Sequence, residues 1–289
     1  MTPLRRRMIE DLELRGYAAG TVLEYVRVVG QLARYYGQSP DELTEEQVRK
    51  YLVYLVQTRE VSRNTYRVAL YGIKFFYEQT LARPLDVLAV ARPRREKKLP
   101  RVLSRAEVWQ VLDAVRNDAY RACLTAIYAC GLRLGEGVRL QVSHVDSARR
   151  VLRVHGKSGK ERQVPLANAT LALLRAHWRT HRSPRWLFVA QSRANRANGL
   201  VAEDRPILDA TLRHAFARAV TASGLRKVPC VHTLRHSYAT HLLEDGVPLP
   251  VIQAYLGHAS PRTTAVYLHL TREIREATRR PVERLMQRP

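Results

Sequence analysis

The segment "RRVLRVHGKSGKERQVPL", residues 149–166, interrupts a chain whose hydrophobic pattern is otherwise almost entirely helical. Two short runs of β-prone residues flank Gly156 and Gly159, an arrangement typical of a β-hairpin. Only 7 of the 49 basic residues are lysines, yet this turn holds Lys157 and Lys160. Lysine can give up a proton and arginine essentially cannot, so either lysine is a candidate proton donor. A solvated turn would have the same composition, and the segment alone leaves both interpretations open.

Residues 1–92 are expected to form a small helical domain. Apolar side chains recur there at intervals of three and four residues, which gives each segment one buried face. Thr44 and Gln47 have the spacing of a capping box and predict a helix start near residue 45. The four predicted helices cover about residues 4–15, 22–36, 45–56 and 66–77.

Residues 93–100 are expected to link this domain to a second one, over residues 101–289. Pro93 and Pro100 bracket a basic run without an apolar face, which is typical of an extended linker. The run either stays solvated or lies along a phosphate backbone. Beyond it, Ser104 and Glu107 form another capping box. With the hairpin included, the predicted fold is mainly α with a small β-hairpin or sheet.

The charge of the chain favours a nucleic-acid partner. Lysine and arginine number 49 against 26 aspartate and glutamate residues, a net charge of +23. Residues 1–98 carry 18 basic and 12 acidic side chains, and the remainder carries 31 against 14, so most of the surplus lies in the second domain. A surplus of this size attracts polyanions, which favours DNA over a merely soluble basic surface. The basic residues expected to contact it are Arg94, Arg95, Lys97, Lys98, Lys160 and Arg162.

The cysteines and the apolar runs indicate the compartment. Cys123, Cys130 and Cys230 are odd in number and lack C-x-x-C spacing, so we expect plain buried thiols in a reducing environment. No stretch approaches the roughly 20 apolar residues of a membrane span, and the N-terminus does not resemble a signal peptide. A cytoplasmic location is therefore expected.

"HTLRHSYATHLL", residues 232–243, places His232 and Arg235 three residues apart on one helical face, where both side chains can address one anion. His232 and His236 also have the spacing of the zinc ligands in H-E-x-x-H. Thr233 occupies the position where that motif needs glutamate, and no metal is expected.

"YACGLRLGEGVRL", residues 128–140, pairs Arg133 with Glu136 among three glycines. Such a pair can clamp a phosphate or be an ordinary surface ion pair. The glycines Gly131, Gly135 and Gly137 predict a close approach of another backbone or a turn.

"LGHASPRTTAVYLHL", residues 256–270, contains Ser260 and Pro261 as a helix start, which puts Tyr267 on the second turn and His258 just before the helix. Its spacing alone makes Tyr267 a packing residue. A nucleophilic role rests on its neighbours.

In this order, the three motifs and the hairpin resemble the tyrosine recombinase (phage integrase) family, and within it the Xer-type and integron-type integrases. The resemblance covers essentially the whole second domain. The helical first domain resembles the SAM-like, core-binding domain of that family.

The resemblance implies that Tyr267 attacks a DNA phosphodiester whose non-bridging oxygens are clamped by Arg133 and Arg235. Glu136 matches the acidic position of the family and would orient Arg133. Gly137 departs from the pattern, because the family usually has leucine or a similar apolar residue there.

The remaining catalytic positions are implied in the same way. Lys157 would protonate the leaving 5′ oxygen, with Lys160 as a competitor for this role. His232 and His258 would position the phosphate and manage protons.

The implied activity is site-specific recombination of double-stranded DNA through a 3′-phosphotyrosine, without ATP, metal or cofactor. Two duplexes require several protomers, so we expect a tetramer on DNA, with a partner recombinase or accessory protein as an option. Residues 271–289 would dock on a neighbouring protomer, or else on their own domain. The alternatives are a type IB topoisomerase-like enzyme and a catalytically silent DNA-binding regulator.

Overall fold

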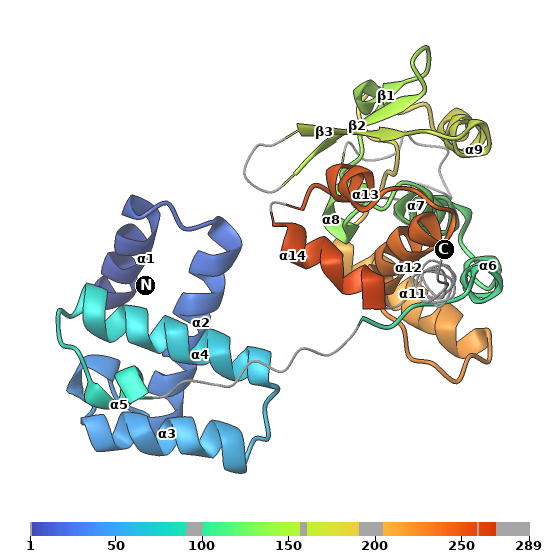
Figure 1. Ribbon diagram of the computed structural model, residues 1–289. Helices are drawn as coiled ribbons and strands as arrows, with labels where there is room; N and C mark the ends of the chain where they lie inside the picture. The colour runs from blue at the N-terminus through green and yellow to red at the C-terminus, as the bar shows by residue number, and fades with distance from the viewer. Residues whose placement is uncertain (1, 91–99, 157–160, 191–204, 259, 270–289) are drawn as a thin grey trace, which may run out of the picture. The chain divides into compact units, whose positions relative to one another are not determined.

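The computed structural model divides the chain into two compact units, Met1–Lys97 and Lys98–Pro289 (Figure 1). We call them the N-terminal and C-terminal units and treat each by itself. Their boundary falls within the stretch that was expected to be a linker. The structure describes residues 2–90, 100–156, 161–190, 205–258 and 260–269.

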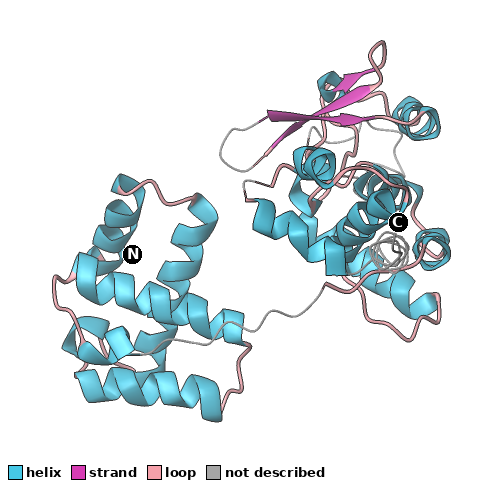
Figure 2. Cartoon of the chain, in the orientation of Figure 1, coloured by secondary structure: helices cyan, strands magenta, loops and turns pink. Residues whose placement is uncertain are grey.

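The N-terminal unit is helical throughout its described part (Figure 2). All four predicted helices are present, and the capping box of Thr44 and Gln47 starts α3 as expected. A π-helical turn that extends α4 and a short fifth helix were not predicted. The elements are α1 (Pro3–Leu14), α2 (Ala19–Tyr36), a 3-10 turn (Pro40–Glu42), α3 (Glu45–Gln57), α4 (Arg63–Phe75), the π turn (Phe76–Thr80) and α5 (Asp86–Val90).

The core of this unit is formed by the apolar faces that the periodicity predicted. Leu32 of α2 and Ile73 of α4 are both fully buried. Helices α2 and α4 approach closely at Gly72, where an added Cβ would lie 2.4 Å from Cγ2 of Val28. A glycine in the middle of a helix lowers its stability, and here it permits this tight crossing.

The C-terminal unit combines helices with one small sheet (Figure 2). Ser104 and Glu107 cap its first helix as predicted. The helices are α6 (Arg105–Asp113), α7 (Asp118–Ala129), α8 (Leu134–Val138), α9 (Asn168–Arg179), α11 (Asp209–Ala222), α12 (Val231–Glu244), α13 (Leu249–Leu256) and α14 (Pro261–Thr264), with 3-10 segments at Val142–His144 and Ala265–His269.

The predicted hairpin is confirmed as β2 (Val151–His155) and β3 (Glu161–Pro165), which pair in antiparallel register. A two-residue strand, β1 (Val145–Asp146), extends it to three strands in the order β1-β2-β3. A strand this short has no periodicity to detect, so the sequence did not predict it. Leu152, Val154 and Val164 are buried, whereas the intervening side chains of β2 and β3 are exposed, as a sheet with one covered face requires.

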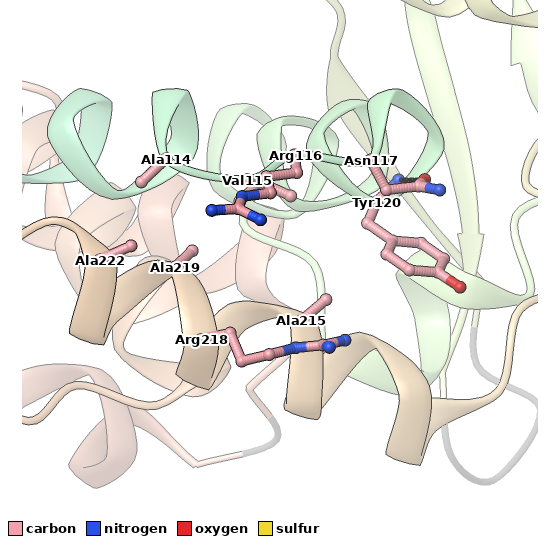
Figure 3. A pocket seen from close by; sticks show the side chains of 9 residues that line it. All are labelled: Ala114, Val115, Arg116, Asn117, Tyr120, Ala215, Arg218, Ala219 and Ala222. Carbon is pink, nitrogen blue, oxygen red and sulfur yellow. Dashed lines mark hydrogen bonds between the residues drawn. The ribbon is translucent and has the colours of Figure 1, made fainter.

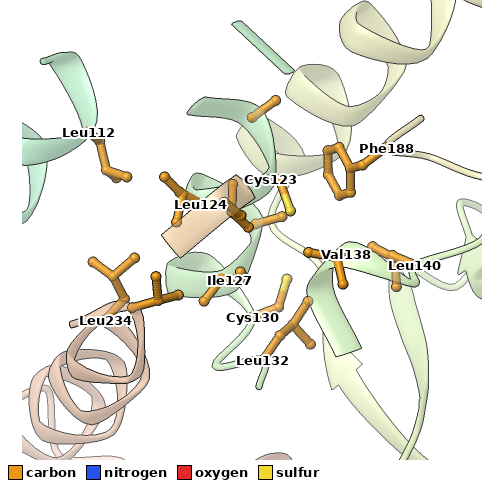
Figure 4. Packing of buried hydrophobic residues seen from close by; sticks show 14 of the residues in the cluster. Leu112, Cys123, Leu124, Ile127, Cys130, Leu132, Val138, Leu140, Phe188 and Leu234 are labelled. Atoms are coloured by element: carbon orange, nitrogen blue, oxygen red, sulfur yellow. The ribbon is translucent and has the colours of Figure 1, made fainter. Parts of the chain in front are cut away.

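Helix α7 lies at the centre of the C-terminal core, where Cys123, Leu124 and Ile127 meet side chains from α6, α8 and α12 (Figure 4). Cys123 and Cys130 are buried thiols, and burial raises the pKa of Cys130 to about 12. Cys230 contradicts the expectation of three buried thiols, because it is exposed at the start of α12. None of the described helices combines the length and apolar composition that crossing a bilayer requires.

Candidate active site

Glu136 is the centre of a cluster of charged side chains from α8, β3 and α12. Arg133 occupies the N-cap of α8, and Glu136 accepts hydrogen bonds from its backbone N–H at 2.7 Å and from its guanidinium at 2.8 Å. Arg162 on β3 donates to both carboxylate oxygens, at 2.9 and 2.7 Å. Nη1 of Arg235 lies 3.7 Å from the same carboxylate. The ion pair expected between Arg133 and Glu136 is therefore part of a buried network.

This network fixes the charge of the site. Burial alone would raise the pKa of Glu136, but hydrogen bonds from Arg162 and Arg133 lower it to about 2. The carboxylate is therefore ionised at neutral pH. One negative charge faces three guanidiniums, which leaves a local surplus of positive charge suited to an anion.

Arg235 is the most enclosed of the three arginines, with 1% of its surface exposed. Its guanidinium donates to the carbonyl oxygen of Gly131 at 2.7 Å and to that of Leu256. Burial, followed by repulsion from Arg133, lowers its pKa to about 9, so the group still carries its charge at pH 7. By contrast, the Arg133 side chain is 37% exposed.

Both predicted histidines belong to this site and are neutral at pH 7. His232 lies in the first turn of α12, where burial and then repulsion from Arg235 and Arg133 lower its pKa. His258 follows α13, and its Nδ1 lies 2.9 Å from Oγ1 of Thr264. Burial, followed by the same two arginines, lowers the pKa of His258 to about 4.

Tyr267 is 1% exposed and packs against α12 and α13. Its hydroxyl lies 2.9 Å from Nδ1 of His236, and its ring stacks on that of His258 with centroids 6.5 Å apart. Burial raises the pKa of Tyr267, although Arg235 and Arg133 oppose the increase. The helix begins at Pro261 as predicted but tightens to a 3-10 segment after Thr264, so Tyr267 is not on a second α-helical turn.

Two residues have roles that the sequence did not indicate. His236 contacts Tyr267, although its spacing from His232 suggested only a metal ligand, an interpretation we rejected. Arg162 was expected to contact DNA. Its side chain is instead 9% exposed and also donates to the carbonyl of Tyr255 at 2.7 Å. This correction makes Arg162 the partner that holds Glu136, since its guanidinium is turned into the protein.

The glycines around Arg133 admit side chains, where the sequence suggested a backbone. An added Cβ on Gly131, whose φ is +57°, would lie 2.4 Å from the ring of Tyr238. A Cβ on Gly137 would lie 2.5 Å from Cγ1 of Ile127. Ile127 therefore fills the space that a larger side chain at position 137 would need, which accounts for the departure from the family pattern.

An open hollow of about 660 Å³ adjoins the charged cluster and is lined by Arg133, Glu136, Arg139, His155 and Gly156, among others. A second cavity, of about 340 Å³, lies between the α6–α7 turn and α11 (Figure 3). It is lined by Arg116, Tyr120, Arg218 and alanines, none of which was a predicted site residue.

Six residues named from the sequence lie outside the described part of the chain. His155 and Glu161 pair at the end of the β2–β3 ladder, directly before and after the turn that carries the two lysines. The C-terminal segment from 270 onward is also not described. The six residues are Arg94, Arg95, Lys97, Lys98, Lys157 and Lys160.

Known proteins resemble this chain over its whole length. The phage integrase family model matches residues 101–273, and the model of the phage integrase N-terminal SAM-like domain matches residues 4–87. The integrase/recombinase y4qK of Sinorhizobium fredii is 39% identical over 100% of this chain and 91% of its own length. Tyrosine recombinase XerD of Pseudomonas putida is 33% identical over 70% of each chain.

Solved structures share the fold. A lambda integrase dimer bound to a COC′ core site has a TM-score of 0.72 at 18% identity, over 91% of this chain and 93% of that one. The XerA recombinase has a TM-score of 0.52 at 25% identity and covers 100% of both chains. The sequence matches and the buried cluster around Glu136 agree, and this chain belongs to the phage integrase family of tyrosine recombinases.

Proposed function

We propose that this protein is a site-specific DNA recombinase that cleaves and rejoins DNA through a 3′-phosphotyrosine, with Tyr267 as the nucleophile. The observation that carries the proposal is the convergence of distant segments on one site. Arg133, Arg235, His232 and His258 surround Tyr267, although they lie up to 134 positions from it along the chain. Packing alone has no need for this set of charged and titratable groups.

The phenolic oxygen of Tyr267 would attack the phosphorus atom of a phosphodiester. A bond forms between this oxygen and phosphorus, the bond from phosphorus to the 5′ oxygen breaks, and the tyrosine gives up its proton. Negative charge grows on the non-bridging oxygens, where the guanidiniums of Arg133 and Arg235 would stabilise it. Because the phosphotyrosine keeps the energy of the broken bond, a 5′ hydroxyl can reverse the reaction, and neither ATP nor a metal is needed.

Lys157 is the proposed donor of the proton that the leaving 5′ oxygen takes up, with Lys160 as the other candidate. The pairing of His155 with Glu161 supports this role, since both lysines lie on the turn that closes this ladder. The hollow beside Arg133 includes His155 and Gly156, which brings the start of the turn to the charged cluster. His232 and His258, neutral at pH 7, can accept or donate hydrogen bonds to the phosphate.

The proposed partners are double-stranded DNA carrying specific sites and further copies of this chain. Exchange between two duplexes requires four cleavages, one for each strand, so a tetramer is the smallest assembly that has a tyrosine for each. The net charge of +23 supports the DNA partner. We further propose that residues 271–289 dock on a neighbouring protomer. Deleting residues 281–289 should then abolish synapsis and spare single-site binding, whereas unchanged recombination would refute the docking.

The test is covalent capture. The full chain is incubated with fragments of its source DNA that are nicked to prevent religation, and adducts that survive SDS are isolated and sequenced to identify the site. Tyr267→Phe should remove the adduct, whereas the control Tyr255→Phe, on the adjacent helix, should retain it. An adduct that persists with Tyr267→Phe would contradict the assignment of the nucleophile.

The same adduct would form in a topoisomerase-like enzyme. A supercoiled plasmid that carries two copies of the captured site separates the two functions. Recombinant products are expected here, and relaxation of supercoils without them would favour the topoisomerase. A regulator without activity would give neither product.

A further inference from the structure

The two groups that would act most directly on a phosphate are both enclosed. Tyr267 and Arg235 are each 1% exposed, and Arg235 already donates to two backbone carbonyls. A phosphodiester that approaches from solvent cannot reach the Tyr267 hydroxyl in this arrangement. The structure therefore represents a resting state, provided that Tyr267 is the nucleophile as proposed above.

One side-chain atom within hydrogen-bonding distance accounts for the position of this hydroxyl. Nδ1 of His236 lies 2.9 Å from it, and the His236 ring is in contact with both neighbours, 4.5 Å from the ring of His232 and 5.7 Å from that of Tyr267. Burial, followed by repulsion from His232 and Arg235, lowers the pKa of His236 to about 4. The imidazole is therefore neutral at pH 7, and its Nδ1 can accept the hydroxyl proton.

We propose that His236 is a positioning residue that holds the Tyr267 hydroxyl in a buried resting position, and that this hydrogen bond must break before Tyr267 attacks. A buried hydroxyl that loses its partner is disfavoured, so the bond makes release of the tyrosine conditional on some compensating interaction. Binding of DNA at the charged cluster around Glu136 would supply that interaction. The free protein thereby keeps its nucleophile from reacting.

The segment that carries Tyr267 is held at a second point, which supports a closed resting state. Oγ1 of Thr264, on the preceding turn, lies 2.9 Å from Nδ1 of His258 and is fully buried. The Tyr267 ring is packed among Ala239, Ile252 and Leu256. Both contacts are made by the few residues between the end of α13 and Tyr267, so a movement of this segment alone would free the hydroxyl.

The chain offers a matched control on the same helix. His241 is also buried, and its Nδ1 lies 2.9 Å from the hydroxyl of Tyr128. This pair has the same chemistry and the same distance as the pair of His236 and Tyr267. None of the residues of the proposed reaction belongs to it, so it separates the loss of any buried bond between histidine and tyrosine from the loss of this one.

The first experiment needs no DNA. Full-length protein is treated briefly with tetranitromethane, and nitration of each tyrosine is measured by mass spectrometry. His236→Phe, which keeps a ring and removes the acceptor, should raise nitration of Tyr267 roughly tenfold, a factor that corresponds to about 1.4 kcal/mol. His236→Asn, whose amide oxygen can replace Nδ1, should restore low nitration, and His241→Phe should leave Tyr267 unchanged. His236→Ala is the second variant if the phenylalanine does not fit.

Nitration of Tyr267 that stays at the wild-type level in folded His236→Phe and His236→Ala would overturn the proposal. So would an equal rise in His241→Phe, because the effect would then be a general loosening of α12. Restoration by asparagine distinguishes the hydrogen bond from the shape of the ring.

The second experiment uses the captured DNA site. At saturating DNA, His236→Phe should form the covalent adduct faster than wild type, again roughly tenfold, with the DNA concentration at half-saturation unchanged. Slower adduct formation would overturn the proposal, because His236 would then assist the attack. Tyr267→Phe in the same background tests the proposed function separately. If the adduct persists in that double variant, the nucleophile is wrong, whereas the nitration result still reports on the resting contact.

Discussion

The two units of the chain differ in what their interiors contain. Thr80 is the one buried polar side chain of the described N-terminal unit apart from its tyrosines, whereas the C-terminal unit buries nine, including Arg235 and His241. Burying a polar group without a partner is unfavourable, so an interior of this kind is retained where the groups have work to do. The contrast locates the chemistry in the C-terminal unit without reference to any motif.

The composition makes the contrast measurable. All three tryptophans and all ten histidines lie beyond residue 98. Tryptophan fluorescence therefore reports the unfolding of the C-terminal unit alone, while circular dichroism follows the helices of both units.

The largest expected effect comes from breaking the buried network at its centre. Glu136→Ala removes the carboxylate that faces three guanidiniums and should lower the free energy of unfolding of the C-terminal unit by about 3–5 kcal/mol. Urea denaturation followed by tryptophan fluorescence measures this loss. Glu46→Ala, which removes an exposed ion pair with Arg49, is the control and should stay within about 0.5 kcal/mol. A loss of similar size in both variants would mean that the burial of Glu136 has no energetic consequence.

A core truncation in the N-terminal unit should show that the two interiors unfold separately. Leu32→Ala removes a fully buried side chain and should destabilise that unit by about 2–5 kcal/mol. The circular dichroism transition should shift to lower urea, and the tryptophan transition should stay in place. A common shift of both signals would show that the units unfold as one.

Acid should destabilise the two units over different ranges of pH. His236 and His258 have folded pKa values of about 4, below the ordinary 6.5, so their contribution is complete above pH 6.5 and is lost as the pH falls toward 4. The pKa of Glu136, lowered from 4.5 to about 2, extends the loss to more acidic conditions by roughly 3 kcal/mol. The tryptophan midpoint in urea should therefore fall between pH 6.5 and 4. The N-terminal unit has no histidine, and an equal fall in its transition over this range would contradict the assignment.

The smallest effect concerns the packing of Gly137 against Ile127. Gly137→Leu should destabilise the C-terminal unit by about 1–3 kcal/mol, because its Cβ would meet Cγ1 of Ile127. Adding Ile127→Ala should recover part of this loss, although Ile127→Ala alone is destabilising. Additive losses in the double variant, measured by the same urea titration, would show that the two positions are independent.

The parts of the fold that depend on neighbours in sequence were predictable. The two capping boxes and the hairpin each depend on residues a few positions apart, and all three are present. The resemblance to a family indicated Arg133, Arg235, His232, His258 and Tyr267, and the structure brings these five together.

The contacts that were missed join residues far apart in the chain. His236 and Tyr267 are 31 positions apart, and Glu136 and Arg162 are 26 apart. Periodicity predicts which face of an element is buried but not which residue it meets, so neither contact could be read from spacing. The exposure of Cys230 was missed for the same reason, since burial of a helix cap depends on what packs beside it.

The packing of position 137 also has an evolutionary consequence. Because Ile127 occupies the space that a side chain at 137 would fill, the two positions share one volume between two helices. Members of the family that carry leucine at the position of Gly137 should therefore carry a smaller residue at that of Ile127. The pair is then a compensated exchange, and a lineage that changed one position first would have passed through a less stable intermediate.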